Sequence, residues 1–395
     1  MITFDEAAVL VAGIAAPLGT ESVVLADARG RVLAAPVLAS RGSPSSCVSA
    51  MDGYAVREAD LAVLPVSLPV VGESFAGAGF ADALPAGACL RIFTGAPLPA
   101  GADRVIIQED VRRDGDRALF ARPLCARRHL RAAGSDFRVG DLLVPAGCRL
   151  NAQQLIAAAA ANLGTLEVFR RPKVAILATG DELAAPGSPN LRPDAIPESV
   201  SFGVAALAED WGARIVSRRR CGDDLPSLRA AAAAAVAEAD VVVVTGGASV
   251  GERDFAREMF APLGLELLFS KVAIKPGKPV WMGRVGGTVI VGLPGNPTSA
   301  LVTARLFLAP LLAGLAGRNP RKAWVWRTMA LAAPMGQEGD RESFHRARLD
   351  LGEVALSDDR DSSTQRALAA SDLLIRRRPN APSVEIGDRV EVLDL

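Results

Sequence analysis

Three segments of this 395-residue sequence place residues that could do chemistry directly after an apolar run. They are KVAILATGDEL (173–183), VVVVTGGASVGERDF (241–255) and TVIVGLPGNPTSA (288–300). A run as uniform as residues 241–244 is typical of a strand buried on both faces of a parallel sheet. Because ligands bind at the carboxyl ends of such strands, the three segments predict one shared cleft.

Glycine follows each of these predicted strands and indicates a site for an anion. Backbone amides in glycine-rich turns ahead of a helix bind phosphate or a similar oxyanion. The glycines of these turns are Gly180, Gly246, Gly247, Gly251 and Gly295. The sequence contains no GxxxxGK[ST] stretch, and no GxGxxG follows a predicted strand, so ordinary nucleoside triphosphate and dinucleotide sites are not favoured.

Carboxylates follow the predicted strands as well. They are Asp181 and Glu182, Asp223 and Asp224, and Glu252 and Asp254. Acids beside an anion would repel it unless a divalent cation lay between them. Mg²⁺ is commonly held by one or two carboxylates together with phosphate oxygens, so we expect it at this edge of the sheet. Each acid taken alone can also be a helix cap or a surface charge.

Lysine usage points to a second anion site. Only five of the 44 basic residues are lysine, and three of these five are Lys271, Lys275 and Lys278. The stretch KPGKP (275–279) sets two of them around prolines that stiffen the loop and prevent a helix. In a chain that otherwise uses arginine, a pair of compact ammonium groups on a rigid turn suits a small tetrahedral oxyanion. A solvated strand end is the alternative reading.

The stretch Gly247-Ala-Ser249-Val-Gly251 also fits the nucleophile elbow of an α/β-hydrolase, G-x-S-x-G. His345 follows it in the right chain order for a catalytic base. The chain has only two histidines, however, and both lie outside the predicted α/β segment. A hydrolase would also leave the lysine loop unexplained, so this alternative is disfavoured.

The elements that position these residues predict a multidomain α/β protein. Strands and helices alternate over residues 172–317, which indicates a central doubly wound, mostly parallel α/β domain. Short strands with glycine and proline turns over 23–134 indicate a β-rich inserted domain. Residues 1–22 with 135–171 are expected to form a small helical linker domain, in which helix 151–164 packs back on the first helix. A β-barrel-like domain is expected over 318–395.

Composition narrows the class of protein. Lys plus Arg equals Asp plus Glu at 44 each, which favours neither a nucleic-acid nor a membrane partner. The five cysteines are scattered, as expected for reduced thiols in the cytoplasm. Acids at positions 5 and 6 argue against a signal peptide, and we find no uninterrupted apolar run of membrane-spanning length. We therefore expect a soluble cytoplasmic protein.

Six segments in order resemble the molybdopterin molybdenumtransferase family, which includes the C-terminal domain of gephyrin. They are SAMDGYAV (49–56), FTGAPLPAGAD (93–103), ATGDEL (178–183), TGGASVGERDF (245–255), KPGKP (275–279) and GLPGNPTSA (292–300). The resemblance covers essentially the whole chain. It implies an enzyme that takes molybdate and adenylylated molybdopterin, cleaves the pyrophosphate bond with Mg²⁺, and releases AMP and molybdenum cofactor.

The resemblance also implies roles for residues at matching positions. It implies a homodimer with its site between the α/β domain of one subunit and the β-rich domain of the other. The implied catalytic acids are Asp52, Asp181, Asp223 and Asp254, with Asp181 and Asp254 holding the metal. The implied substrate-binding residues are Thr94, Gly180, Gly246, Gly247, Ser249, Gly251, Pro294, Gly295, Asn296 and Pro297. The implied molybdate-binding residues are Lys275, Lys278, Ser299, Arg346 and Ser363.

Three positions depart from the family pattern. Val200 stands in PESVSF where the family has asparagine, and Cys47 replaces an aspartate ahead of SAMDGYAV. Ser363 lies in DRDSS rather than in a GHQGS-like segment. These departures bear on pterin contacts and on the choice between molybdate and tungstate. They leave the reaction class unchanged.

A different class of function is a non-catalytic scaffold or carrier that binds the pterin or a partner protein. The retention of both the lysines and the acids favours catalysis, because a scaffold needs neither. A cofactor-synthesis enzyme of this kind is expected to contact a molybdopterin adenylyltransferase and molybdoenzyme chaperones.

Overall fold

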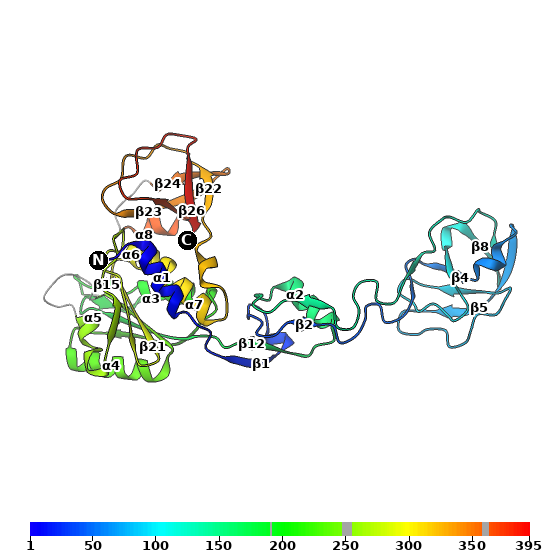
Figure 1. Ribbon diagram of the computed structural model, residues 1–395, viewed down its shortest axis with the longest axis horizontal. Helices are drawn as coiled ribbons and strands as arrows, with labels where there is room; N and C mark the ends of the chain where they lie inside the picture. The colour runs from blue at the N-terminus through cyan, green and yellow to red at the C-terminus, as the bar shows by residue number, and fades with distance from the viewer. Residues whose placement is uncertain (190–191, 247–254, 358–362) are drawn as a thin grey trace.

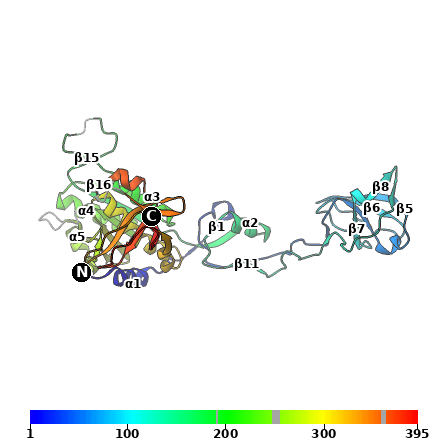
Figure 2. The same cartoon turned by 90° about the horizontal axis from the view of Figure 1, so that it is seen from above.

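The computed structural model describes residues 1–189, 192–246, 255–357 and 363–395, and these form a body with a long arm. Figures 1 and 2 show the body at one end, a small linker region beside it and a β-rich domain at the far tip. Residues 247–254, which hold most of the TGGASVGERDF segment, lie outside the described residues. So do residues 358–362, which include the start of the segment around Ser363. The multidomain α/β class predicted from the sequence is confirmed.

The body is built on a six-stranded sheet with the order β16-β13-β17-β21-β20-β18. The strands are β16 (Arg214–Cys221), β13 (Lys173–Thr179), β17 (Val241–Thr245), β21 (Thr288–Leu293), β20 (Trp281–Val285) and β18 (Glu266–Phe269). The first four are parallel, and β20 and β18 are antiparallel to their neighbours. The predicted strands 173–179 and 241–245 are thus adjacent, and both are buried on both faces.

Helices cover both faces of this sheet, which makes it doubly wound. One core cluster joins Val174 and Ile176 to α3 (Val200–Asp210) and α7 (Ala309–Leu315). A second joins Ala175 and Leu177 to α4 (Leu225–Glu238). Alternate residues of β13 therefore face opposite helical layers, as the pleat of a strand requires. The short helix α5 (Phe255–Glu258) adds Ala256 to the second cluster.

One helical stretch of the body is apolar enough to cross a membrane by length and composition. It combines α6 (Pro297–Thr303), the π-helical stretch η5 (Ala304–Leu308) and α7, 19 residues in all. Its most apolar window is 94% buried inside the protein, which is how the core helix of a soluble domain behaves.

The first helix differs from its expected place. α1 (Phe4–Ile14) buries Phe4, Ala7 and Val11 in the core cluster of the α/β domain and contacts α7. It does not pack on the second helix, α2 (Ala152–Ala160), which belongs to a separate cluster. The expectation that these two helices form one linker domain is therefore corrected. Periodicity marked the buried face of α1 but carried no information about its partner.

The linker region is a small pair of two-stranded ladders with α2 beside them. β1 (Thr20–Val24) pairs with β12 (Thr165–Phe169), and β2 (Val37–Leu38) pairs with β11 (Leu142–Val144). The chain leaves the body along β1 and returns along β12. The arm is therefore an insertion that departs and returns at neighbouring points.

The tip of the arm is a six-stranded sheet with the order β7-β4-β6-β5-β9-β8. Its strands are β4 (Gly53–Val56), β5 (Val66–Ser74), β6 (Cys89–Ile92), β7 (Arg104–Ile107), β8 (Val111–Asp114) and β9 (Arg117–Phe120). A two-stranded ladder of β3 (Val48–Ser49) and β10 (Leu130–Arg131) lies at its base. This is the β-rich domain predicted from the short strands of this segment.

The C-terminal domain shares a sheet with the α/β segment. Its order is β19-β23-β25-β26-β22, with β24 paired to β23. The strands are β19 (Ile274–Lys275), β22 (Arg327–Ala330), β23 (Glu342–Asp350), β24 (Glu353–Leu356), β25 (Leu373–Arg377) and β26 (Arg389–Asp394). β19 ends at Lys275, the first residue of KPGKP, so this loop begins inside the C-terminal sheet. The joint fixes the two domains against each other.

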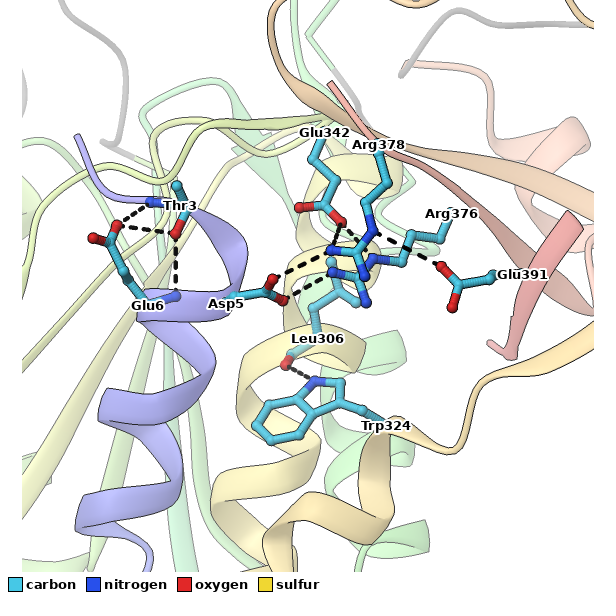
Figure 3. Close-up of polar contacts among 9 residues, drawn as sticks. All are labelled: Thr3, Asp5, Glu6, Leu306, Trp324, Glu342, Arg376, Arg378 and Glu391. Carbon is cyan, nitrogen blue, oxygen red and sulfur yellow. Dashed lines mark hydrogen bonds and ion pairs between the residues drawn. The ribbon is translucent and has the colours of Figure 1, made fainter. Parts of the chain in front are cut away.

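A buried ion pair ties the chain ends to this joint (Figure 3). Arg376 pairs with Glu342 and donates to Asp5 of α1 at 2.9 Å. Its guanidinium lies over the rings of Phe4 and Trp326, 4.7 and 4.8 Å from their centroids. The side chains of Arg376 and Glu342 are only 4% and 7% exposed. This buried cluster of charged side chains therefore joins the N-terminal helix to the C-terminal sheet.

Replacing Arg376 with methionine is expected to destabilise the protein by about 3 kcal/mol, because Glu342 would keep a buried charge without its main partner. Arg378→Met is the matched control, since that side chain is 51% exposed and also contacts Glu342 and Asp5. Its loss should cost less than about 1 kcal/mol. Urea unfolding followed by tryptophan fluorescence measures both, and equal losses would contradict the prediction.

Candidate active site

The KPGKP loop is held in place from both domains that border it. Lys275 pairs in register with Ser343 of β23, which anchors the start of the loop in the C-terminal sheet. Gly277 lies against α6 with φ +99°, and a Cβ there would approach Thr303 Cγ2 to 2.2 Å. Only glycine fits this contact without a shift. The loop therefore presents both of its lysines from a fixed backbone.

A pocket of about 430 Å³ opens beside this loop, between the α/β and C-terminal domains. Its lining includes four of the five predicted molybdate-binding residues: Lys275, Lys278, Ser299 and Arg346. In the described part of the chain neither lysine forms an ion pair. Two ammonium groups, a guanidinium and a hydroxyl thus converge on one cavity. This combination suits a small dianion, because charged donors form the strongest hydrogen bonds to an oxyanion.

Arg346 is the buried member of the set, with 6% of its surface exposed. It donates to the Thr298 hydroxyl at 3.0 Å and to the Thr364 carbonyl at 2.9 Å. Thr298 lies in α6 and Thr364 directly precedes α8 (Gln365–Ala369), so two segments besides its own strand hold the guanidinium. Such anchoring reduces the entropy that the side chain must lose on binding a ligand.

A His–carboxylate pair in the same pocket was not predicted as a site. His345 Nε2 lies 2.6 Å from Glu338 Oε1, and both side chains are largely buried. Burial raises the pKa of Glu338, but the Ser343 hydroxyl, His345 and Arg377 outweigh it and hold that pKa below its usual value. The Glu338 carboxylate therefore stays ionised to a lower pH than an ordinary glutamate does. In the sequence, His345 was expected only as the base of a disfavoured hydrolase. Glu338 lies in no motif that would have marked it as a site residue.

A second cleft of about 340 Å³ lies at the carboxyl ends of β13, β17 and β21, as the strand-end pattern predicted. Its lining includes Thr179, Thr245, Gly246, Gly295, Asn296 and Pro297. Gly246 has φ +91°, and a Cβ there would lie 2.4 Å from the Thr179 carbonyl oxygen. A Cβ on Gly295 would lie 3.3 Å from Gly246 Cα. These glycines allow the strand ends to approach and leave backbone facing the cleft.

Other predicted residues surround this cleft in different ways. Gly180 follows β13 with φ +148°, and Pro294 is buried directly after β21. Ser363 lines this cleft and not the lysine pocket, although its neighbour Thr364 accepts a hydrogen bond from Arg346. Val200, the departure from the family pattern, also lines the cleft.

Two predicted acids meet at the edge of the sheet. Asp181 Oδ1 accepts a hydrogen bond from the Asp223 backbone amide at 3.0 Å, which joins the turns after β13 and β16. Asp224 caps α4 by accepting from the Ser227 amide at 3.0 Å, and hydrogen bonds from Ser227 lower its pKa. Asp224 is thus a helix cap, which was the alternative to a metal-binding role for each of these acids.

The metal prediction involves residues that the structure describes only in part. Asp254, Gly247, Ser249 and Gly251 lie outside the described residues, as does Glu252. Within the described ranges no group of three or more His, Cys, Asp or Glu side chains forms a metal centre. The exposed Asp181 carboxylate suits a cation that takes one protein oxygen and draws its other ligands from phosphate and water.

Asp52 directly precedes β4 and Thr94 follows β6, so both belong to the domain at the tip of the arm, which lies away from the body (Figure 1). Asp52 Oδ1 accepts from the Thr94 amide at 2.7 Å and from its hydroxyl at 2.8 Å. These two hydrogen bonds lower the pKa of Asp52. The structure therefore brings Asp52 and Thr94 together, but not to the other predicted site residues of their own chain.

Gly277→Ala is expected to weaken molybdate binding at least about tenfold, because the strained φ and the clash with Thr303 would displace both lysines. Gly339→Ala is the matched control. Gly339 lines the same pocket, and a Cβ there meets no atom within 4 Å. Calorimetric titration with sodium molybdate gives both dissociation constants. Similar constants for the two variants would show that the loop geometry does not set the affinity.

Comparison with known proteins covers almost the whole chain. Residues 2–162 match the family described as MoeA N-terminal region (domain I and II). Residues 175–314 match the probable molybdopterin binding domain, and residues 328–395 match the MoeA C-terminal region (domain IV). These three matches meet at the same segments where the structure changes from linker to α/β domain and from α/β to C-terminal sheet.

Curated relatives and solved structures agree with these matches. The chain is 36% identical over 351 residues to a molybdopterin molybdenumtransferase of Haemophilus influenzae, covering 87% of this chain and 86% of the relative. It is 35% identical over 387 residues to molybdopterin molybdenumtransferase 2 of Mycobacterium tuberculosis, covering 95% of each. A crystal structure of a molybdopterin biosynthesis MoeA protein from Pyrococcus horikoshii superposes with a TM-score of 0.85 at 30% identity, covering 100% of this chain and 99% of that one.

Proposed function

The chain belongs to the molybdopterin molybdenumtransferase family, and from this premise we propose that it releases AMP from adenylylated molybdopterin as it inserts molybdenum. It is a transferase of molybdenum cofactor biosynthesis. The observation that carries the finer proposal is the pocket in which Lys275, Lys278, Ser299 and Arg346 converge. Arg341 also lines this cavity, so four cationic side chains surround it and suit the double negative charge of molybdate.

The chemistry follows from how the two cavities are lined. Molybdate binds in the lysine pocket, where the ammonium groups and Arg346 neutralise it and Ser299 donates a hydrogen bond. The pterin dithiolene and its adenylate lie in the neighbouring cleft, with phosphate oxygens on the glycine turns after β17 and β21. α6 lines both cavities through Thr298 and Pro297, so the two substrates meet across one helix end.

Mg²⁺ has a specific place in this proposal. Asp181 and Asp254 would hold it against the diphosphate, where it supplies charge neutralisation for cleavage of the phosphoanhydride bond. Asp181 is already oriented by the Asp223 amide. The second carboxyl oxygen of Asp181 is thereby left for a cation.

The arm completes the site only if a second copy of the chain is present. Asp52 and Thr94 belong to a tip that lies far from the body of its own chain (Figure 2). We therefore take the working enzyme to be a homodimer in the cytoplasm, in which each arm reaches the cleft of the other subunit. A symmetric dimer would place two such sites in one molecule.

The test is direct measurement of AMP. Full-length protein is mixed with adenylylated molybdopterin and MgCl₂, and AMP is followed by chromatography before and after molybdate is added. We expect release that depends on both molybdate and Mg²⁺, with sulfate as the matched inactive oxyanion. Pterin binding without any release of AMP would instead indicate a carrier protein.

A further inference from the structure

The tip of the arm carries an exposed aromatic stack beside Asp52 and Thr94. The rings of Phe75 and Phe93 are nearly parallel, at 10°, with centroids 4.6 Å apart. The Arg91 guanidinium lies 4.7 Å from the centroid of Phe93. Phe93 contacts both Arg91 and Phe75 and is half-buried, whereas Phe75 is 42% exposed, so Phe75 offers the more accessible aromatic surface.

The backbone holds Phe75 in a fixed position. Its amide donates to the Ala78 carbonyl and the Ala78 amide donates back to its carbonyl, each at 3.0 Å. Gly77 takes φ +83° within the turn that these bonds close. The Phe93 amide donates to the Ser74 carbonyl at 3.2 Å, which ties the turn to the strand that leads into Thr94. An aromatic face held in this way loses little entropy when a ring stacks on it.

The polar groups around the stack select the kind of ligand. Arg91 donates to the Gly53 carbonyl at 3.0 Å and to Gln108 Oε1 at 2.6 Å, so both of its terminal nitrogens already donate to protein atoms. Oδ1 of Asp52 accepts from Thr94, whereas its Oδ2 has no partner in the described part of the chain. The patch therefore offers a flat apolar face and a free acceptor. These features suit a planar ring with N–H donors at its edge and disfavour a phosphate.

We propose that Phe75 is the stacking surface for the fused heteroaromatic ring of the substrate bound in the cleft of the second subunit. Adenine and the pterin share this chemistry, since both are flat fused rings that carry an exocyclic amino group at the edge. The inference rests on the proposed function, in which the arm tip completes that cleft. Phe75 itself lies outside the strand-end motifs of the α/β domain.

Three variants separate stacking from simple apolar contact. Phe75→Leu keeps an apolar side chain and removes the aromatic face, whereas Phe75→Tyr keeps the face. Val63→Ala is the control, because Val63 is 79% exposed in the same domain and outside the stack. We expect KM for adenylylated molybdopterin to rise about 5- to 100-fold in Phe75→Leu and to stay within about twofold in the other two. An active wild type with an unchanged KM in Phe75→Leu would overturn the inference, as would an equal rise in Phe75→Tyr.

Binding of the separate ring compounds shows whether adenine or the pterin stacks on Phe75, and this measurement does not require turnover. AMP is titrated by calorimetry, and pterin-6-carboxylate by quenching of its own fluorescence. A weaker affinity for AMP alone in Phe75→Leu assigns adenine, and a weaker affinity for the pterin alone assigns the pterin. If Phe75→Leu binds both rings as the wild type does, the inference is wrong. If the wild type binds a ring through Phe75 but releases no AMP, the proposed function fails while the ring site stands.

Discussion

Lys275→Met is expected to lower kcat/KM for molybdate about 100- to 1,000-fold, the usual loss when one preorganised charged donor to an oxyanion is removed. Lys275 lines the pocket without an ion pair in the described residues, so its charge is available to the ligand. Methionine keeps much of the length of the side chain and removes only the ammonium group. The rate of AMP release at several molybdate concentrations gives the change.

Lys322→Met is the matched control for this result. Lys322 is another of the five lysines, is exposed, and does not line the pocket. Its replacement should leave kcat/KM unchanged. A Lys275→Met enzyme with wild-type kinetics would remove molybdate from the lysine pocket, whatever the reaction proves to be.

Mixing two inactive variants is expected to restore about a quarter of the wild-type activity, because each site draws on two subunits of a symmetric dimer. Asp52→Ala disables the arm and Lys275→Met disables the body. After subunit exchange at equal amounts, about half of the dimers are mixed, and each mixed dimer has one fully intact site of its two. AMP release by the mixture, compared with each variant alone, measures the recovery.

The control mixture combines Asp52→Ala with Thr94→Ala. Both substitutions lie in the arm, where the two residues contact each other. No site in any dimer of this mixture has an intact arm contact, so activity should not recover. Absence of recovery in the first mixture as well would place Asp52 and Lys275 in a site formed by a single chain. An Asp52→Ala variant that is active by itself would remove Asp52 from the reaction.

Local sequence patterns predicted much of the fold because they report on burial and on the carboxyl ends of strands. The runs 173–179 and 241–245 are neighbouring parallel strands, and the glycines that follow them do border one cleft. The unusual clustering of lysines also marked a loop whose Lys275 and Lys278 line one pocket. These signals are local, since each depends on residues within a few positions of one another.

What the sequence could not give depends on distant contacts. The partner of α1 is set by Phe4 and Asp5 meeting residues more than 300 positions away, such as Phe344 and Arg376. The Glu338–His345 pair and the aromatic stack of Phe75 and Phe93 likewise join separate strands and loops. Ser363 was assigned from a loosely matching segment, and the structure places it in the second cleft.

The departure and return of the arm at neighbouring strands make it a removable module. Leu38 and Leu142 are register partners in β2 and β11, so a short turn between them could close the chain with the whole tip deleted. The shortened protein would keep both cavities of the body and the charged core at the chain ends. It should still capture molybdate yet perform no transfer, which would turn a biosynthetic enzyme into a simple oxyanion receptor.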